Sequence, residues 1–426
     1  MKNNINTVAP WLAWVPKEWE IRKIKHFFTV VNGSTPKSSE STYWDGNITW
    51  ITPADYKTED KYICSSKKTI TQEGLNSCGT SKVPVGSILV SNRAPIGSIG
   101  IAEKELCTSQ GCKSLVKANE INEEYIYYYL SVMSGPLNML GRGTTFSELS
   151  SNDLANFLFP LPTANEQEAI VKILNKKIAA INGVISNKTE ILELLQEQKA
   201  SEICTCVIKG IRSTAPMKDS GVDWLGQIPA HWQILTNHQL FAERNIKCTE
   251  PDAILLSVTK HLGVILQSQA EELNLATVAP AETTEGYKVV QKGDLVMNIM
   301  RAKDGSYGVS EYNGVISPAY CIYYPRQEIN PQYLYYLFKT PMYMEIFKNY
   351  STGIAEHRMR LYPVNFFKIP AVVPPLEEQN EIVAYLDKRV KNIDELISLT
   401  QQQIEKLKEY RQSVISEVVT GKVAVE

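Results

Sequence analysis

Two stretches of the chain, residues 164–210 and 376–426, carry the apolar period of a long helix. Apolar side chains recur there every three or four residues or at multiples of seven, which places them on one stripe of a helix. Glu, Gln and Lys fill the remaining surface. The stripe residues are Ile170, Leu174, Ile178, Ile181, Ile185, Leu192, Leu195 and Ile203 in the first stretch, and Ile382, Leu386, Val390, Ile393, Ile397, Ile404, Leu407 and Val414 in the second.

The two blocks before these helices, residues 1–163 and 211–375, contain shorter apolar runs. "NITWIT" (47–52), "SILVS" (87–91), "AILLSV" (253–258) and "DLVMNIM" (294–300) are typical of strands. Gly, Pro, Asn and Ser interrupt these runs, and short helices are predicted at 122–132 and 330–340. Each block is therefore expected to be a mixed α/β domain.

The chain order predicts how the long helices pair. The first helix leaves block one and leads into block two, so the second can bury its stripe against the first by running back along it. We therefore predict an α+β fold: two mixed α/β domains (1–163 and 211–375) separated by a pair of long antiparallel coiled-coil helices (164–210 and 376–426). The alternative is two amphipathic helices that pack separately on their own domains.

The chain contains an internal repeat, and each of its two copies covers roughly half of the chain. "VPKEWEIRKIKHFF" (15–28) is echoed by "IPAHWQILTNHQLF" (228–241), and "EINEEYIYYYL" (120–130) by "EINPQYLYYLF" (328–338). "DLANFLFPLPTANEQEAIVKIL" (153–174) likewise matches "PVNFFKIPAVVPPLEEQNEIVAYL" (363–386). The features keep their order, which indicates two copies of one domain-plus-helix unit.

One tetrapeptide, Asn330-Pro331-Gln332-Tyr333, differs by one residue from the Asn-Pro-Pro-Tyr signature of enzymes that methylate adenine. The first copy has Asn122-Glu123-Glu124-Tyr125 at the same place, without the proline. Asn at the N-cap and Pro at the first helical position are typical of a helix start. We therefore predict a helix start here. The sequence shows neither a Gly-rich nucleotide-binding turn nor a P-loop.

Composition adds limits on the class of protein. Hydrophobic residues make up 43% and charged residues 21% of the chain, as in ordinary globular proteins, and the net charge of −2 argues against a uniformly basic nucleic-acid binder. The eight cysteines are scattered, which favours reduced thiols, and the five histidines show no metal-ligand spacing. The histidine spacing leads us to expect no metal site. No apolar run is long enough to span a membrane, so we expect a cytoplasmic location.

Three segments carry a resemblance to a known family: "NGSTPKSSESTYWDGNITWITPADY" (32–56), "SNRAPIGSIGIAEKELCTSQGCKSL" (91–115) and "GTTFSELSSNDLANFLFPLP" (143–162). With the Pro-then-Glu-Gln helix openings at 162–167 and 374–379, the whole chain resembles the specificity (S) subunits of type I restriction-modification systems. The domains would then be two target-recognition domains. Block two lacks the first segment and has "NIKCTEPDAILLSVTKHLGVI" (245–265), which resembles another subclass and suggests that the two halves read different sequences.

The resemblance implies a non-catalytic reader of a split, asymmetric site in double-stranded DNA. Such subunits hold two adenine-N6 methyltransferase (M) subunits, and motor-nuclease (R) subunits join them to cleave unmethylated DNA, a form of phage defence. S-adenosylmethionine, ATP and magnesium are then expected on the partners, with no cofactor on this chain. Two alternatives remain: a stand-alone DNA methyltransferase or nuclease, and a coiled-coil adaptor that binds only protein.

Candidate DNA contacts are Arg, Lys, Asn, Gln, His and Thr residues in or beside Gly-punctuated loops, since most of these side chains can pair with base edges or phosphates. Each could instead be a solvated surface or turn residue, whereas Tyr43, Trp44 and Trp50 are expected in the core. The candidates are Thr35, Lys37, Asn92, Arg93, Gln110, Lys113, Arg142, Thr144 and Thr145 in block one, and Asn298, Arg301, Lys303, His357, Arg358 and Arg360 in block two.

Candidate partner-binding residues lie near the starts of the long helices. Their alternative role is helix capping and internal packing. They are Glu166, Gln167, Ile170, Glu378, Gln379 and Ile382.

Overall fold

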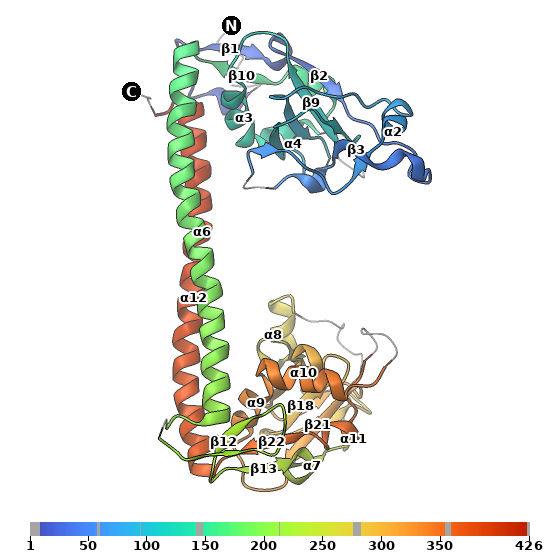
Figure 1. The fold of residues 1–426 in the computed structure, drawn as a ribbon, viewed down its shortest axis with the longest axis vertical. Helices are drawn as coiled ribbons and strands as arrows, with labels where there is room; N and C mark the ends of the chain where they lie inside the picture. The colour runs from blue at the N-terminus through green and yellow to red at the C-terminus, as the bar shows by residue number, and fades with distance from the viewer. Residues whose placement is uncertain are drawn as a thin grey trace. The chain divides into compact units, whose positions relative to one another are not determined.

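The computed structural model describes residues 9–57, 60–93, 95–141, 148–212, 214–275, 283–353 and 359–423 (Figure 1). Contacts divide the chain into unit 1, Met1–Thr189 with Gln401–Glu426, and unit 2, Glu190–Thr400. Each unit therefore contains one globular block and a segment of each long helix.

Both long helices are continuous. Helix α6 covers Ala164–Lys209 (46 residues) and helix α12 covers Leu376–Val419 (44 residues). Within each unit, residue numbers rise along α6 where they fall along α12, so the two helices run antiparallel. The hydrogen-bonded pairs are Asn182–Arg411 and Lys188–Gln403 in unit 1, and Lys199–Asp394 and Glu202–Arg389 in unit 2.

The predicted apolar stripes lie largely at the helix contact. Leu174 and Leu386 are fully buried, and Ile185 and Ile404 are only 6% and 7% exposed. The predicted fold class is confirmed, and the alternative of two separately packed helices is wrong. The physical reason is that two apolar stripes of the same period can pack against each other along the helices, which removes their surface from water.

The two blocks share one sheet topology. The strand order is β2-β9-β6-β7-β4 in unit 1 and β14-β21-β18-β19 in unit 2, with neighbours antiparallel except β7 and β4. The repeat seen in the sequence is thus also a repeat of the sheet. The strands are β2 (Phe28–Asn32), β4 (Tyr62–Ile63), β6 (Ile88–Ser91), β7 (Ile99–Ala102) and β9 (Cys112–Lys117), and β14 (Phe241–Glu243), β18 (Leu295–Asn298), β19 (Tyr307–Val309) and β21 (Tyr320–Pro325).

The units differ in what they add to this sheet. Unit 1 adds the sheet β5-β3-β8 and helix α2, whereas unit 2 adds the pairs β15-β16 and β17-β20 and helix α8. These additions lie in the parts of the sequence where the repeat is weakest. Their bounds are Thr69–Ile70, Trp44–Ile51, Cys107–Thr108 and Gln72–Asn76 in unit 1, and Leu256–Thr259, Gly263–Leu266, Lys288–Val290, Gly314–Ile316 and Gln267–Glu272 in unit 2.

The tetrapeptide at Asn330 begins helix α9 (Pro331–Phe338), and its counterpart begins α3 (Glu123–Ser131). The Asn330 side chain accepts a hydrogen bond from the N–H of Gln332, and Pro331 occupies the first turn. The predicted helix start is confirmed. The first free N–H groups of a helix need such an acceptor, which explains the asparagine in both copies.

Of the three aromatic residues predicted in the core, Trp50 is buried, whereas Tyr43 and Trp44 are only partly buried. Trp50 is 5% exposed, packs edge-on against Trp44, and donates its indole N–H to the carbonyl of Ser34. The eight cysteines are all free. None of the helices in the described ranges is long and apolar enough to cross a membrane.

Candidate DNA-binding surface and helix junctions

In unit 1, three loops meet at one edge of the sheet. Strands β2 and β6 both end beside the start of β9, because each is antiparallel to it: Asn32 is in register with Lys113, and Ser91 with Cys112. The N–H of Asn92 donates to the carbonyl of Gly111, which ties two of the loops together. Six of the predicted DNA contacts lie at this edge or in the loops that leave it: Thr35, Lys37, Asn92, Arg93, Gln110 and Lys113.

Several of these residues are organised by hydrogen bonds. The Thr35 hydroxyl donates to the Gln110 side-chain oxygen. The Lys113 ammonium donates to Asn32 Oδ1 at 2.9 Å, and because the side chain is buried, its pKa is lowered. Lys37 is exposed. Thr35 and Lys113 thus use their donors within the unit, and the buried side chains of Lys113 and Asn92 support the edge, whereas Lys37 faces solvent.

Asn92 and Arg93 converge on Glu148, a residue that the sequence analysis missed. Asn92 Nδ2 donates to Glu148 Oε1 at 2.9 Å, and Arg93 Nε and Nη2 lie 3.2 Å from Glu148 Oε2. The N–H of Leu149 also donates to the Asn92 carbonyl at 2.9 Å. The only signal in the sequence was that Glu148 follows the "RGTT" segment, where three DNA contacts were predicted.

In unit 2, the predicted contacts follow the strand equivalent to β6. Asn298 ends β18, and its side-chain oxygen accepts from the N–H of Met300. Arg301 and Lys303 lie in the next turn, and the N–H of Leu361 donates to the Ile299 carbonyl, which brings exposed Arg360 to the same place. The predictions at Arg142, Thr144, Thr145, His357 and Arg358 lie outside the described residues.

The turn after β18 is further held by Lys339, which the sequence analysis also missed. Its ammonium donates to the carbonyls of Lys260 (2.7 Å) and Gly305 (2.5 Å) and lies 4.8 Å from the centre of the Tyr307 ring. Burial lowers the pKa of Lys339 to about 8. The side chain thus joins two loops of unit 2 that are far apart in sequence.

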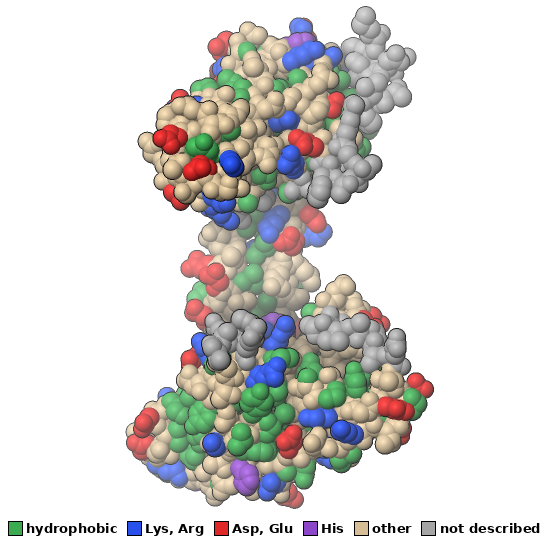
Figure 2. All heavy atoms as spheres, turned by 90° about the vertical axis from the view of Figure 1, so that its right-hand side faces the viewer, with side chains coloured by type: hydrophobic (Ala, Val, Ile, Leu, Met, Phe, Trp, Pro, Cys, Tyr) green, Lys and Arg blue, Asp and Glu red, His purple; other side chains and the backbone are tan. Residues whose placement is uncertain are grey.

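Apolar side chains accompany these polar contacts. Figure 2 shows a broad group of hydrophobic side chains beside Lys and Arg on the face of unit 2 that it presents. Met300, next to Arg301 in the chain, is 42% exposed, and Tyr362, two residues after Arg360, is 41% exposed. Apolar side chains in a DNA-reading surface can contact the thymine methyl group.

The partner-binding candidates occupy two equivalent helix junctions. Gln167 and Gln379 are 5% and 2% exposed, and each donates to a proline carbonyl while accepting an N–H from the start of α3 or α9. Ile170 and Ile382 are each 1% exposed. The structure thus gives these four residues the alternative role of capping and packing, and a docking role for them stays a prediction.

The glutamates of the two junctions share one partner, a tryptophan at the equivalent place in each copy. Glu166 accepts from the Trp19 indole N–H (3.2 Å) and Glu378 from that of Trp232 (2.9 Å). Hydrogen bonds from the hydroxyl and backbone of Thr163 lower the pKa of Glu166. These carboxylates hold each block to the start of its helix.

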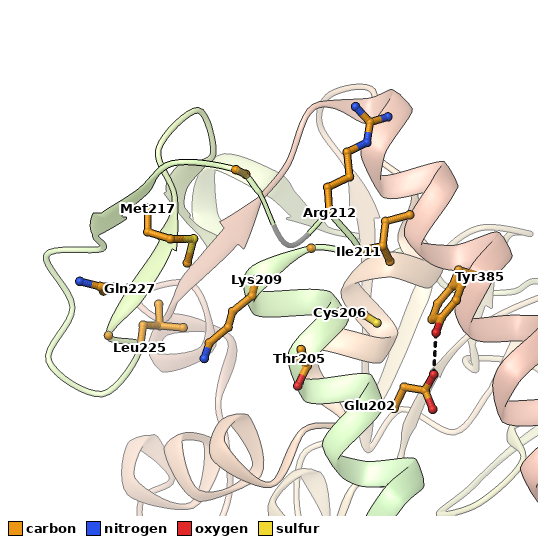
Figure 3. Close-up of a pocket in the computed structure, with 13 residues that line it drawn as sticks. Glu202, Thr205, Cys206, Lys209, Ile211, Arg212, Met217, Leu225, Gln227 and Tyr385 are labelled. Atoms are coloured by element: carbon orange, nitrogen blue, oxygen red, sulfur yellow. Dashed lines mark hydrogen bonds between the residues drawn. The ribbon is translucent and has the colours of Figure 1, made fainter.

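A groove of about 950 Å³ lies in unit 2 between the last turns of α6 and the hairpin of β11 (Met217–Asp219) and β12 (Gln227–Pro229), as Figure 3 shows. The Glu202 carboxylate there accepts from Tyr385 (2.8 Å) and Arg389 (2.7 Å), so it serves the helix pair. Within the described ranges, no group of three or more His, Cys, Asp or Glu side chains could hold a metal ion.

Comparison with known proteins agrees with this geometry. The family model for the type I restriction modification DNA specificity domain matches residues 16–194 and 269–409. The MjaVIII specificity subunit of Methanocaldococcus jannaschii is 22% identical over 97% of this chain and 94% of its own length. The MjaIX specificity subunit of the same organism is 35% identical, but the match covers 43% of this chain and less than half (42%) of that protein.

A solved structure confirms the fold. A chain from the work "Structural basis underlying complex assembly and conformational transition of the type I R-M system" has a TM-score of 0.69 and 17% identity, covering 96% of this chain and 99% of that one. The repeated sheets and long helices define a protein of two similar domains. The chain belongs to the family of type I restriction-modification DNA specificity subunits.

Proposed function

We propose that this chain reads a split, asymmetric site in double-stranded DNA, one half with each block. The observation that carries the proposal is the repeated sheet, which has candidate DNA contacts at the same edge in both units. Asn92 and Arg93 follow β6 in unit 1; in unit 2, Asn298 is the last residue of β18 and Arg301 follows it. The residue types at these two places are alike, but the elements added around them differ: the sheet β5-β3-β8 in unit 1, and the pairs β15-β16 and β17-β20 in unit 2. A shared scaffold with different added elements suits two different half-sites.

The same proposal gives the chemistry to partners. Two adenine-N6 methyltransferase subunits would bind S-adenosylmethionine, and motor-nuclease subunits would use ATP and magnesium, whereas this chain would act without catalysis or cofactor. The expected location is the cytoplasm, where bacterial and archaeal DNA lies. Asn330 and Tyr333, the residues that suggested a methyltransferase, serve a helix cap and internal hydrogen bonds.

The long helices offer a surface for the methyltransferase subunits. In unit 2, four large apolar side chains of the helix pair are about half exposed: Ile191 (46%), Leu194 (56%), Leu396 (51%) and Leu399 (54%). Two of them lie on each helix, three residues apart, so each pair shares one helix face. Exposed apolar faces of this kind are typical of protein–protein contacts.

The first test concerns DNA. Once methylation mapping has given the recognised sequence, Arg301→Ala in the complex with the methyltransferase subunit should weaken binding to that site about 10- to 100-fold, the effect of one lost base contact. Binding to unrelated duplexes should change less. Lys406→Ala, which removes an exposed cation of α12 paired with Glu409, is the control. Equal affinity of Arg301→Ala and wild type for the mapped site would exclude Arg301 as a reader.

The second test concerns the partner. Leu194→Lys combined with Leu396→Lys should reduce co-purification of the methyltransferase subunit at least about tenfold, because two charges would be buried in an apolar contact. Gln196→Lys, at an exposed position of the same helix, should leave it unchanged. If both variants retain the subunit, this face is not the docking site. A chain that methylates adenine without any partner would instead support the stand-alone enzyme.

A further inference from the structure

We infer that Glu148 is a specificity-determining residue of unit 1: it orients Arg93 and opposes phosphate binding at the edge of the sheet. The inference rests on the proposed reading of DNA by this edge. It assigns a role to a carboxylate, the group least expected beside DNA, since every carboxylate near the duplex repels phosphates.

The geometry shows more than a loose surface ion pair. Arg93 and Glu148 form an isolated antiparallel β-bridge, and the N–H of Leu149 donates to the Asn92 carbonyl, so the two backbones are fastened together. Both oxygens of Glu148 are used, one by Asn92 and the other by Arg93. The Asn92 side chain is fully buried, so its amide N–H holds Glu148 Oε1 in one place.

The pair is nevertheless accessible. The side chains of Arg93 and Glu148 are 47% and 42% exposed, so the guanidinium can meet a ligand while its Nε and Nη2 stay on the carboxylate. A guanidinium has five N–H donors, and the carboxylate leaves several free. Glu148 therefore presents Arg93 in a fixed direction, as reading a base edge requires.

The charges at this edge explain why the pair would discriminate between sequences. Lys113 is buried and donates to Asn32, and it interacts electrostatically with both Glu148 and Arg93. Without Glu148, Arg93 would be a free cation that binds any phosphate. With Glu148 present, its negative charge opposes phosphate binding by Arg93. Only a matching base edge compensates for this repulsion, because it forms hydrogen bonds with the oriented guanidinium.

The experiment compares binding of the mapped site and of an unrelated duplex at several salt concentrations, using the chain with its methyltransferase subunit. Glu148→Gln keeps the shape of the side chain and removes its charge; the amide retains one accepting oxygen and replaces the other with a donating NH₂ group. We expect tighter non-specific binding, a salt slope steeper by about 0.9 (one more phosphate contact), and a specific-to-non-specific ratio at least about fivefold lower. In the background of Arg93→Ala, Glu148→Gln should change this ratio little.

The control is Glu105→Gln, which also removes one negative charge. Glu105 lies in the turn after β7, at the opposite edge of the sheet, and forms an exposed ion pair with Lys82. This substitution should leave the ratio unchanged. An unaltered ratio and salt slope in Glu148→Gln would overturn the inference, as would an equal loss of both affinities with a lower melting temperature, which indicates a structural role only. Wild type without any sequence preference would refute the proposed function itself.

Discussion

Replacing Trp232 by alanine should lower the free energy of unfolding of unit 2 by about 3–5 kcal/mol, the usual loss for a large buried aromatic side chain. Trp232 is fully buried and donates its indole N–H to Glu378 at 2.9 Å. Its ring also lies against Gly210, the residue after α6, which has a φ of 76°; a Cβ at this position would approach the ring to 3.1 Å. The change would remove the anchor of both long helices in unit 2.

The repeat supplies a matched control. Trp19 has the equivalent position and hydrogen bond in unit 1, but it is only partly buried, so Trp19→Ala should destabilise its unit by less. Because a chain of two units need not unfold in one step, stability is best followed by hydrogen exchange at rising denaturant in 211–375 and 16–163 separately. Equal effects of the two substitutions would contradict the expected difference.

Raising the pH above 10 should unfold both units. Burial raises the pKa of many tyrosines well above the ordinary value of 10.0, so in the folded chain they keep their protons. In the unfolded chain the same phenols ionise near pH 10. The stability that they contribute is therefore complete below pH 10 and is lost as the pH rises further. The residues are Tyr56, Tyr125 and Tyr129 in unit 1, and Tyr307, Tyr323, Tyr333 and Tyr343 in unit 2.

The measurement is circular dichroism and phenolate absorbance during an alkaline titration. The buried tyrosines should ionise only together with the loss of the helix signal. Tyr343→Phe removes one of the buried phenols and should raise the midpoint of the alkaline transition. A smooth titration of all tyrosines near pH 10 with the helices intact would show that the phenols are not buried.

The sequence predicted the features that depend on neighbouring residues. The period of Leu174 and Leu386 indicated the long helices, and Asn122 and Asn330 marked helix starts, because apolar spacing and capping act within a few residues. The internal repeat predicted that the second block has the same architecture as the first. The resemblance of the 32–56 and 91–115 segments gave the family, which the matched family model confirms.

The site was predicted only as a set of loops. Sequence reasoning put Asn92 and Arg93 among the candidates, but not the carboxylate 55 residues later that holds Arg93. It also offered Gln167 and Gln379 as partner contacts, whereas both side chains are buried and bridge a helix start to a neighbouring loop. A polar residue on a helix is equally compatible with solvent, partner or interior.

The chain's own sequence thus determined its repeated units, its helices and their caps, since these follow from local hydrogen bonding and the period of apolar side chains. The tertiary structure alone decided which loops meet at the sheet edge, that Glu148 and Lys339 fasten them, and which helix residues are buried. These outcomes depend on strand register and packing between distant segments, and no short-range pattern encodes either.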